Sequence, residues 1–204
     1  KSHLYVANTG AAISKEGIDA LLSSHSSTKR GNQIGRFGLG FKSLLRLDGA
    51  IDIFSKTWGG IRFDPQRCRH EIKERFGGEN APGLRMAWSQ GHKDRFADSM
   101  LGRLGWAETI VRVEIADAKL VEPLRAEILE FPAEFLLFNP IPIQLALDVG
   151  GSEPRVFSVE GEGETRDLVE GDKRSAWRLF QMEVPVTDEA AKSEAQACAA
   201  HVLD

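Results

Sequence analysis

Alternating apolar and polar residues predict short β-strands along most of the chain. The clearest strand covers 106–115, where Ile110, Arg112 and Glu114 share one side and three aliphatic residues share the other. A period of two residues is typical of a strand with two different faces. Shorter runs predict further strands at 3–8, 51–55, 60–64, 84–88, 141–147, 156–159, 165–169 and 176–184.

Helical segments are predicted between these strands. Ser14 is a good N-cap for a helix that ends near residue 24, with Ile18 and Leu21 on its apolar face. A second helix covers 41–47 and ends at an Asp-Gly pair. Further helices are predicted at 66–76, 122–129, 133–138 and from 188 onward, whereas 89–105 has no clear pattern. The mixture indicates an α/β chain, more closely an α+β sandwich.

Charge divides the chain into two parts. The chain has 204 residues, of which 42% are hydrophobic, enough for one or two domains with a core. Residues 108–204 carry 20 acidic and nine basic side chains, whereas the residues before them are net positive. This change favours a boundary nearby, and we expect domains at 1–117 and 118–204. The acidic part does not indicate a nucleic-acid surface.

Two cysteines and the absence of long apolar runs bear on location. No stretch approaches the roughly twenty apolar residues that a membrane span needs. Cys68 and Cys198 lie far apart and outside any metal-binding spacing. We therefore expect a cytoplasmic protein without a membrane partner.

The stretch 34–43 carries the strongest chemical pattern. Its three glycines leave the backbone open, and successive N–H groups can turn toward an anion. Five basic residues and no acidic ones lie between 23 and 46, so an anionic ligand is expected. The run is not a Walker A motif, which needs a different glycine spacing. The alternative is a glycine-rich hairpin or loop before an ordinary core helix.

A second segment lies upstream of this glycine run. Residues 4–10 read as a strand that ends in Asn-Thr-Gly, 25 residues before Gly35. Together the two segments resemble the nucleotide-binding boxes of GHKL ATPases: gyrase, heat-shock chaperone, histidine kinase and MutL. The resemblance is closest to the chaperone branch and to sacsin-type domains, with Asn-Thr-Gly at 8–10, Ser-x-Lys at 27–29 and Gly-Arg-Phe-Gly-x-Gly-Phe-Lys-Ser at 35–43. It covers residues 4–55.

The resemblance implies a Bergerat-type fold, with a mixed, mostly antiparallel sheet, helices on one face and part of a second α+β region behind it. It also implies ATP and Mg²⁺ as cofactors, and an ATP lid at 23–35. The site residues that it implies are Asn8, Thr9, Gly10, Lys29, Gly35, Arg36, Phe37, Gly38, Leu39, Gly40, Phe41, Lys42, Ser43 and Thr109.

Three departures from the family pattern affect this interpretation. Asn8 stands where the family has an Asp that reads adenine, and Ala12 replaces a glycine. An Asn oxygen can still accept a hydrogen bond from the adenine amine. The family's catalytic Glu and magnesium-binding Asn lie on an upstream helix that cannot be located here. The chain is therefore expected to be a fragment that lacks this helix, and its catalytic residues are unknown.

The expected function is ATP binding, with hydrolysis if the upstream helix supplies the base and the metal ligand. In the resembling family, lid closure couples hydrolysis to self-dimerisation or to a protein partner, as in chaperone-like remodelling by a larger multidomain protein. The alternative is a nucleotide-sensing or scaffold module that binds ATP without hydrolysing it. A third possibility is a glycine-rich protein-interaction domain without any ligand.

Overall fold

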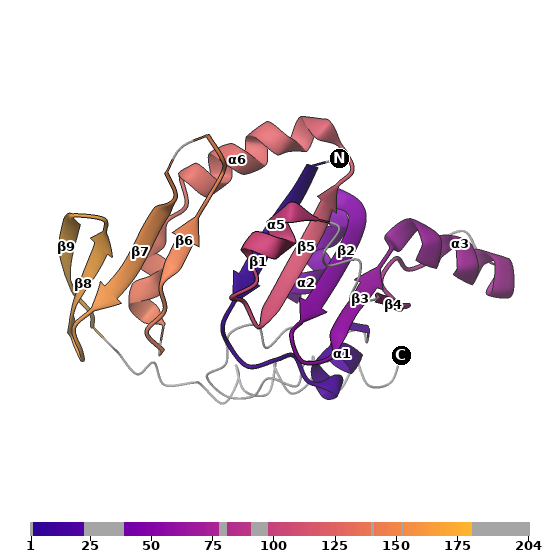
Figure 1. Cartoon of the computed structure of the whole chain (residues 1–204), viewed down its shortest axis with the longest axis horizontal. Coiled ribbons are helices and arrows are strands. Elements are labelled where there is room, and N and C mark those ends of the chain that lie inside the picture. The colour runs from indigo at the N-terminus through magenta and orange to yellow at the C-terminus, as the bar shows by residue number, and fades with distance from the viewer. Residues whose placement is uncertain are drawn as a thin grey trace, which may run out of the picture. The chain divides into compact units, whose positions relative to one another are not determined.

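The computed structural model describes residues 2–22, 39–77, 81–90, 98–139, 141–151 and 153–180 (Figure 1). The chain forms two compact units, 1–126 and 127–204. The boundary that we expect from charge, 117/118, lies slightly before this division. The fold class is confirmed: helices combine with two sheets whose described strand pairs are all antiparallel.

The first unit contains a five-stranded sheet. Its strands, in spatial order, are β1 (Ser2–Asn8), β5 (Thr109–Ile115), β2 (Asp48–Ser55), β3 (Gly59–Phe63) and β4 (Trp88–Gln90). Strand β5 pairs with β1 on one side and with β2 on the other, so it lies inside the sheet. Because successive side chains of a strand point to opposite faces of the sheet, β5 places Thr109, Val111 and Val113 on one face and Ile110, Arg112 and Glu114 on the other.

One face of this sheet packs against helices. These are α1 (Lys15–Leu22), α2 (Leu39–Ser43) and the 3₁₀ turn η1 (Leu44–Leu47). Leu47, Ile51, Ile53, Phe63, Leu84 and Val113 form the buried core between the two layers. Helix α6 (Val121–Leu129) adds Leu124 to the same core. We call this the helix-covered face.

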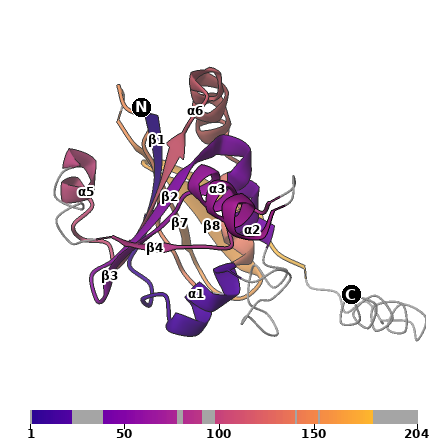
Figure 2. The same ribbon diagram turned by 90° about the vertical axis from the view of Figure 1, so that its right-hand side faces the viewer.

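The opposite face has a smaller core of Phe54, Leu101, Ala107 and Ile110. Leu101 belongs to α5 (Ser99–Arg103), a short helix inside the stretch for which the sequence has no clear pattern. The Asp98 carboxylate accepts a hydrogen bond from the Met100 N–H and caps this helix. Figure 2 shows α5 on one side of the sheet and α1, α2 and α3 (Pro65–Phe76) on the other.

Several predicted elements have different ends in the structure. The expected helix 41–47 is α-helical only to Ser43 and continues as the 3₁₀ turn η1. The expected strand 84–88 is wrong except at its last residue, because β4 begins at Trp88. The expected strand 141–147 is formed only at its end, by β6 (Leu145–Leu147).

The second unit contains a four-stranded meander. Strands β6, β7 (Arg155–Glu160), β8 (Thr165–Glu170) and β9 (Lys173–Arg178) pair in this order. The 3₁₀ segment η3 (Ala133–Phe138) buries Ala133 and Leu136 against Phe157. Strand β9 begins before the expected 176–184 and is exposed throughout.

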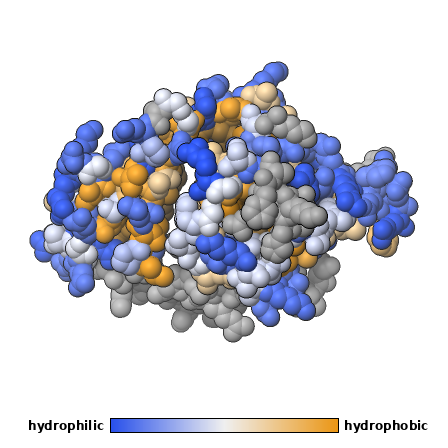
Figure 3. All heavy atoms as spheres, in the orientation of Figure 1, coloured by the Kyte–Doolittle hydropathy of each residue, from blue (hydrophilic) through white to orange (hydrophobic). Residues whose placement is uncertain are grey.

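Many exposed apolar side chains belong to the second unit. Figure 3 shows apolar residues gathered around β6 and β7. Among the described residues of this unit, the large apolar side chains that are exposed are Leu129, Phe135, Phe138, Ile141, Ile143, Val156, Trp177 and Phe180. Within the described parts of the chain, no helix is both long enough and apolar enough to cross a membrane.

Candidate functional site

Three polar residues form a row at one end of the five-stranded sheet. Asn8 on β1 lies directly opposite Thr109 on β5, and Thr109 lies opposite Ser55 on β2. Residues directly opposite one another in neighbouring strands point to the same face. Val113 follows Thr109 at an even spacing and is part of the helix-covered core, so this polar row lies on the helix-covered face.

Thr109 is the unusual member of the row. The residue is only 8% exposed, and its Oγ1 atom is buried without a hydrogen-bond partner in the described structure. Buried hydroxyl groups nearly always have a partner, because leaving one unpaired costs about 1–3 kcal/mol. The end of β5 therefore holds a buried polar atom that lacks a hydrogen-bond partner in the described structure.

Asn8 closes a turn at the end of β1. Its Oδ1 atom accepts a hydrogen bond from the Gly10 N–H at 3.1 Å, with Thr9 between them. This is the bond that a turn-forming Asn makes, so the turn interpretation of 8–10 describes the local geometry well. A carbonyl oxygen has two lone pairs, however, and one of them remains outside this bond. Asn8 can therefore hold the turn and accept a second hydrogen bond.

An apolar patch lies beside the polar row. Val6 precedes Asn8 by two residues on the same side of β1 and is 54% exposed. It lies directly opposite Val111, two residues after Thr109. A flat, partly apolar ring could lie over these two valines with its polar edge toward Asn8 and Thr109.

The glycine run is only partly described. Lys29, Gly35, Arg36, Phe37 and Gly38, with the proposed lid, lie outside the described residues.

Leu39, Gly40, Phe41, Lys42 and Ser43 form α2. The Phe41 ring lies 5.0 Å from the Phe63 ring and packs against the helix-covered core. Phe41 thus anchors α2 to the sheet, and Lys42 lies in the last turn. The structure therefore brings Asn8, Thr9, Gly10 and Thr109 together and puts α2 on the same face.

Sequence reasoning missed a carboxylate next to the row. Oε1 of Glu108 accepts hydrogen bonds from the Thr57 hydroxyl at 2.8 Å and the Ser55 hydroxyl at 3.0 Å. These two bonds lower the pKa of Glu108 below its ordinary value. In the sequence Glu108 marks only the change of charge. Its position directly before Thr109, with hydroxyl residues at the end of the neighbouring strand, is the pattern that could have revealed it.

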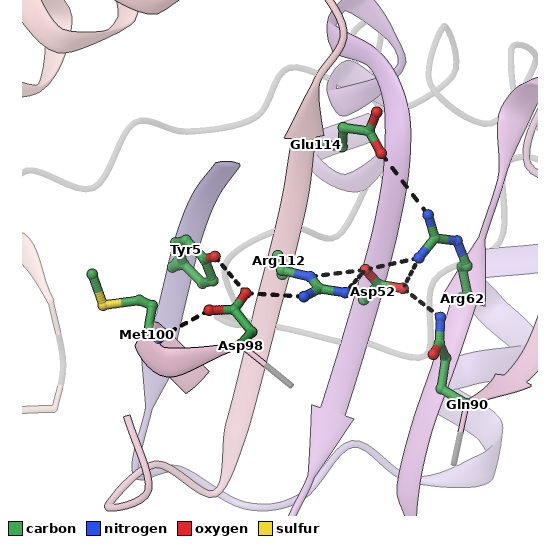
Figure 4. Close-up of polar contacts among 8 residues, drawn as sticks. All are labelled: Tyr5, Asp52, Arg62, Gln90, Asp98, Met100, Arg112 and Glu114. Atoms are coloured by element: carbon green, nitrogen blue, oxygen red, sulfur yellow. Dashed lines mark hydrogen bonds and ion pairs between the residues drawn. The ribbon is translucent and has the colours of Figure 1, made fainter. Parts of the chain in front are cut away.

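The opposite face of the sheet holds a network of charged residues (Figure 4). Asp52, only 3% exposed, accepts hydrogen bonds from Arg112 at 2.8 and 3.0 Å, from Arg62 at 3.2 Å and from Gln90 at 2.8 Å. Arg112 also donates to Asp98 at 3.0 Å. The network joins β2, β3, β4 and β5 to the capping residue of α5.

An open cleft of about 550 Å³ lies over this network. Its lining residues are His3, Tyr5, Arg62, Gln90, Asp98, Ser99 and Arg112. Tyr5 donates to Asp98 at 2.6 Å, and burial together with this bond raises the pKa of Tyr5 to about 12. Burial and the nearby Arg112 lower the pKa of His3. The arginines of the cleft, Arg62 and Arg112, are paired with the carboxylates of Asp52 and Asp98, and these bonds tie the strands of the sheet together.

We expect the Asp98 contacts to make stability depend on pH. Partial burial works against ionisation of Asp98, but hydrogen bonds from Tyr5, Arg112 and the Met100 N–H outweigh it and lower the pKa. A lowered pKa stabilises the fold above the pKa of an unfolded Asp, and this stabilisation is lost as the pH falls through the folded value. The stability difference between wild type and Asp98→Asn should therefore be largest near pH 7 and shrink below about pH 4.

Urea unfolding between pH 7 and pH 3 measures this difference. Asp117→Asn is the matched control, because its carboxylate accepts from the Lys119 N–H outside the network. A difference for Asp98→Asn that stays constant across this range would contradict the role assigned to the charge.

Metal binding has no visible ligand set in the described part of the chain. No group of three or more His, Cys, Asp or Glu residues there could hold a metal ion. The amino-acid sequence matches no protein-family model, and comparisons with curated proteins and with solved structures give no significant match.

Proposed function

We propose that the first unit binds ATP, with the adenine ring at the ends of β1 and β5 on the helix-covered face. The observation that carries this proposal is the buried Thr109 hydroxyl without a partner in the described structure, directly opposite Asn8. Such an atom has a free-energy cost that a polar ligand edge would remove.

The chemistry of adenine suits this pair of side chains. The exocyclic amine donates hydrogen bonds, and the open lone pair of Asn8 Oδ1 can accept one. The Thr109 hydroxyl can donate to a ring nitrogen of the same edge. Val6 and Val111 offer apolar surface to the face of the ring, as is usual for small-molecule sites.

The proposed binding of the ATP phosphates rests on the sequence rather than on the geometry of the site. The glycine run and its basic residues favour an anion, and Lys42 on α2 is the described cation of this run. The resemblance to GHKL ATPases alone supports the remaining parts of the proposal. These are hydrolysis, a bound Mg²⁺, lid closure, self-dimerisation and chaperone-like remodelling of a protein partner. A module that binds ATP without hydrolysing it is supported by Asn8 and Ala12. A reducing, cytoplasmic setting is supported by the free thiol of Cys68, which is buried and donates to the Pro82 carbonyl.

We expect Asn8→Ala to weaken ATP binding by about 1–3 kcal/mol, or about 5- to 150-fold, because the adenine amine loses its acceptor. Thr109→Val should act in the same direction. GTP, which lacks the amine at this position, should lose much less. Isothermal titration calorimetry with a non-hydrolysable ATP analogue and the matching GTP analogue measures both affinities.

Asn139→Ala is the matched control. Asn139 Oδ1 accepts from the Ile141 N–H at 3.3 Å in the second unit, which is the same local bond that Asn8 makes. Equal affinities in wild type and both folded site variants would refute the adenine site. If the site variants do weaken ATP binding, an assay of phosphate release by the wild type distinguishes the two forms of the proposal. Release of phosphate indicates an ATPase, and no release indicates a module that only binds ATP.

A further inference from the structure

The turn between β2 and β3 is bonded to both sides of the candidate adenine site. We propose that this turn, residues 56–58, acts with Glu108 as a positioning element that holds Asn8 and Thr109 in register for adenine. This inference rests on the proposed function and adds residues that do not touch the nucleotide themselves.

The first attachment joins the turn to β5. Thr57 donates its hydroxyl hydrogen to Glu108 at 2.8 Å, and the Thr57 N–H donates to Ser55 Oγ at 3.1 Å. Ser55 in turn donates to the same oxygen of Glu108. An ionised acceptor makes stronger hydrogen bonds than a neutral one. The residue before Thr109 is therefore held by two hydroxyl groups from the β2 end.

The second attachment joins the turn to the segment behind Asn8. Nε1 of Trp58 donates to the Ile13 carbonyl at 3.2 Å. Both side chains also pack against the helix-covered core. Ile13 follows Gly10 by three residues, so this bond limits how far the 8–10 turn can move away from β5.

Backbone bonds close the arrangement. The Glu108 N–H donates to the Asn8 carbonyl at 2.9 Å, and the Lys56 N–H donates to the Glu108 carbonyl at 3.0 Å. Lys56 Nζ also donates to the Trp106 carbonyl. The bonded path runs from Asn8 through Glu108 to the turn, then through Trp58 to Ile13 and back along the chain to Gly10. The candidate site lies on this closed path.

A closed path matters because a hydrogen-bonding site needs precise geometry. Reading groups must stay within about 0.5 Å of their productive positions, and supporting hydrogen bonds provide this rigidity. If the turn were released, Asn8 and Thr109 would still be present but could shift relative to each other. Contacts to the adenine edge would then weaken more than apolar contacts to the ring, which tolerate small shifts.

Thr57→Val tests this inference, since valine keeps the shape of threonine and removes the hydroxyl. We expect ATP affinity to fall about 3- to 10-fold, the equivalent of one hydrogen bond, while GTP affinity changes less than twofold. The ATP-to-GTP selectivity should fall accordingly. Thr57→Ser, which retains the hydroxyl, should restore selectivity, and Glu108→Gln should reduce it because the acceptor loses its charge.

Controls separate positioning from general destabilisation. Thr165→Val and Glu122→Gln make the same chemical changes at exposed sites outside this path and should leave selectivity unchanged. If Thr57 and Glu108 only stabilised the fold, their variants would lower the affinities for ATP and GTP equally. Coupling is a further readout, because Thr57→Val should lose most of its effect when Thr109 is already valine.

The outcomes distinguish this inference from the function beneath it. If the wild type binds ATP and Asn8→Ala weakens it, but folded Thr57→Val and Glu108→Gln keep full selectivity, the positioning role is wrong and the adenine site stands. If Asn8→Ala and Thr109→Val have no effect on ATP, or the wild type does not bind ATP, the proposed function fails and the inference falls with it.

Discussion

Replacing Asp52 with alanine is expected to lower the free energy of unfolding by about 3–5 kcal/mol, because it removes one partner of a buried ion pair. The Asp52 carboxylate accepts hydrogen bonds from Arg62, Arg112 and Gln90. The Arg112 side chain is only 14% exposed, so water cannot replace the lost carboxylate well. Asp98 would remain as its other charged partner.

Urea unfolding followed by circular dichroism measures this loss, and hydrogen exchange of the β2 and β5 amides assigns it to the sheet. Asp52→Asn separates charge from shape, since it keeps an acceptor oxygen and removes the negative charge. We expect an intermediate loss for it. A loss below about 1 kcal/mol for Asp52→Ala, which is typical of an exposed pair, would show that the network contributes little.

Gly49→Val is expected to destabilise the first unit by on the order of 4 kcal/mol or to prevent its folding. A Cβ atom at Gly49 would lie 1.9 Å from the backbone carbonyl oxygen of Glu114. The pairing of β2 with β5 shifts register between Asp48 and Ile51, around this glycine. A glycine inside a strand often marks such a close backbone approach. The two strands would have to separate to admit a side chain.

Gly102→Ala is the matched control for this substitution. A Cβ atom there meets nothing within 4 Å, and the residue lies in α5. This change should be neutral or stabilise by about 0.4–1 kcal/mol, because alanine restricts the unfolded chain. Thermal unfolding by calorimetry compares the two variants. Similar midpoints for Gly49→Val and wild type would mean that the strands approach less closely than the structure indicates.

Local sequence patterns were sufficient for most strands and helices of this fold. Alternation predicted β5 well because one side of this strand is apolar and the other carries Arg112 and Glu114. It could not predict which residues the polar side meets, because Arg112 bonds to Asp52, 60 residues earlier in the chain. That choice depends on the strand order, which is a tertiary property.

Helix α5 shows why the polar stretch was unpredictable. The helix has five residues, too few for a recognisable period, and it depends on the burial of Leu101 and on its Asp98 cap. Isolated helices of this length are unstable in water. Tertiary packing therefore decides whether such a segment is helical.

Only part of the candidate site could likewise be predicted from the sequence. The resemblance suggested Asn8 and Thr109, and the structure puts them opposite each other. Glu108 can be selected only once its neighbouring strand is known, because its partners Ser55 and Thr57 are 53 and 51 residues away in the chain. The glycine run and Lys29 remain predictions from sequence.

The pairing of β1 with β5 also affects how the chain acquires its structure during synthesis. Strand β1 ends at Asn8 and its partner strand β5 begins only at Thr109, so β1 leaves the ribosome long before its neighbour exists. Pairing between distant segments is slow, and an unpaired apolar strand favours aggregation while it waits. Asn8 and Thr109 meet only when this pairing is complete. We expect this pairing to form last. A nucleotide bound between these two residues, as proposed above, would therefore stabilise the paired strands, and added ATP would then raise the yield of correctly folded nascent chains.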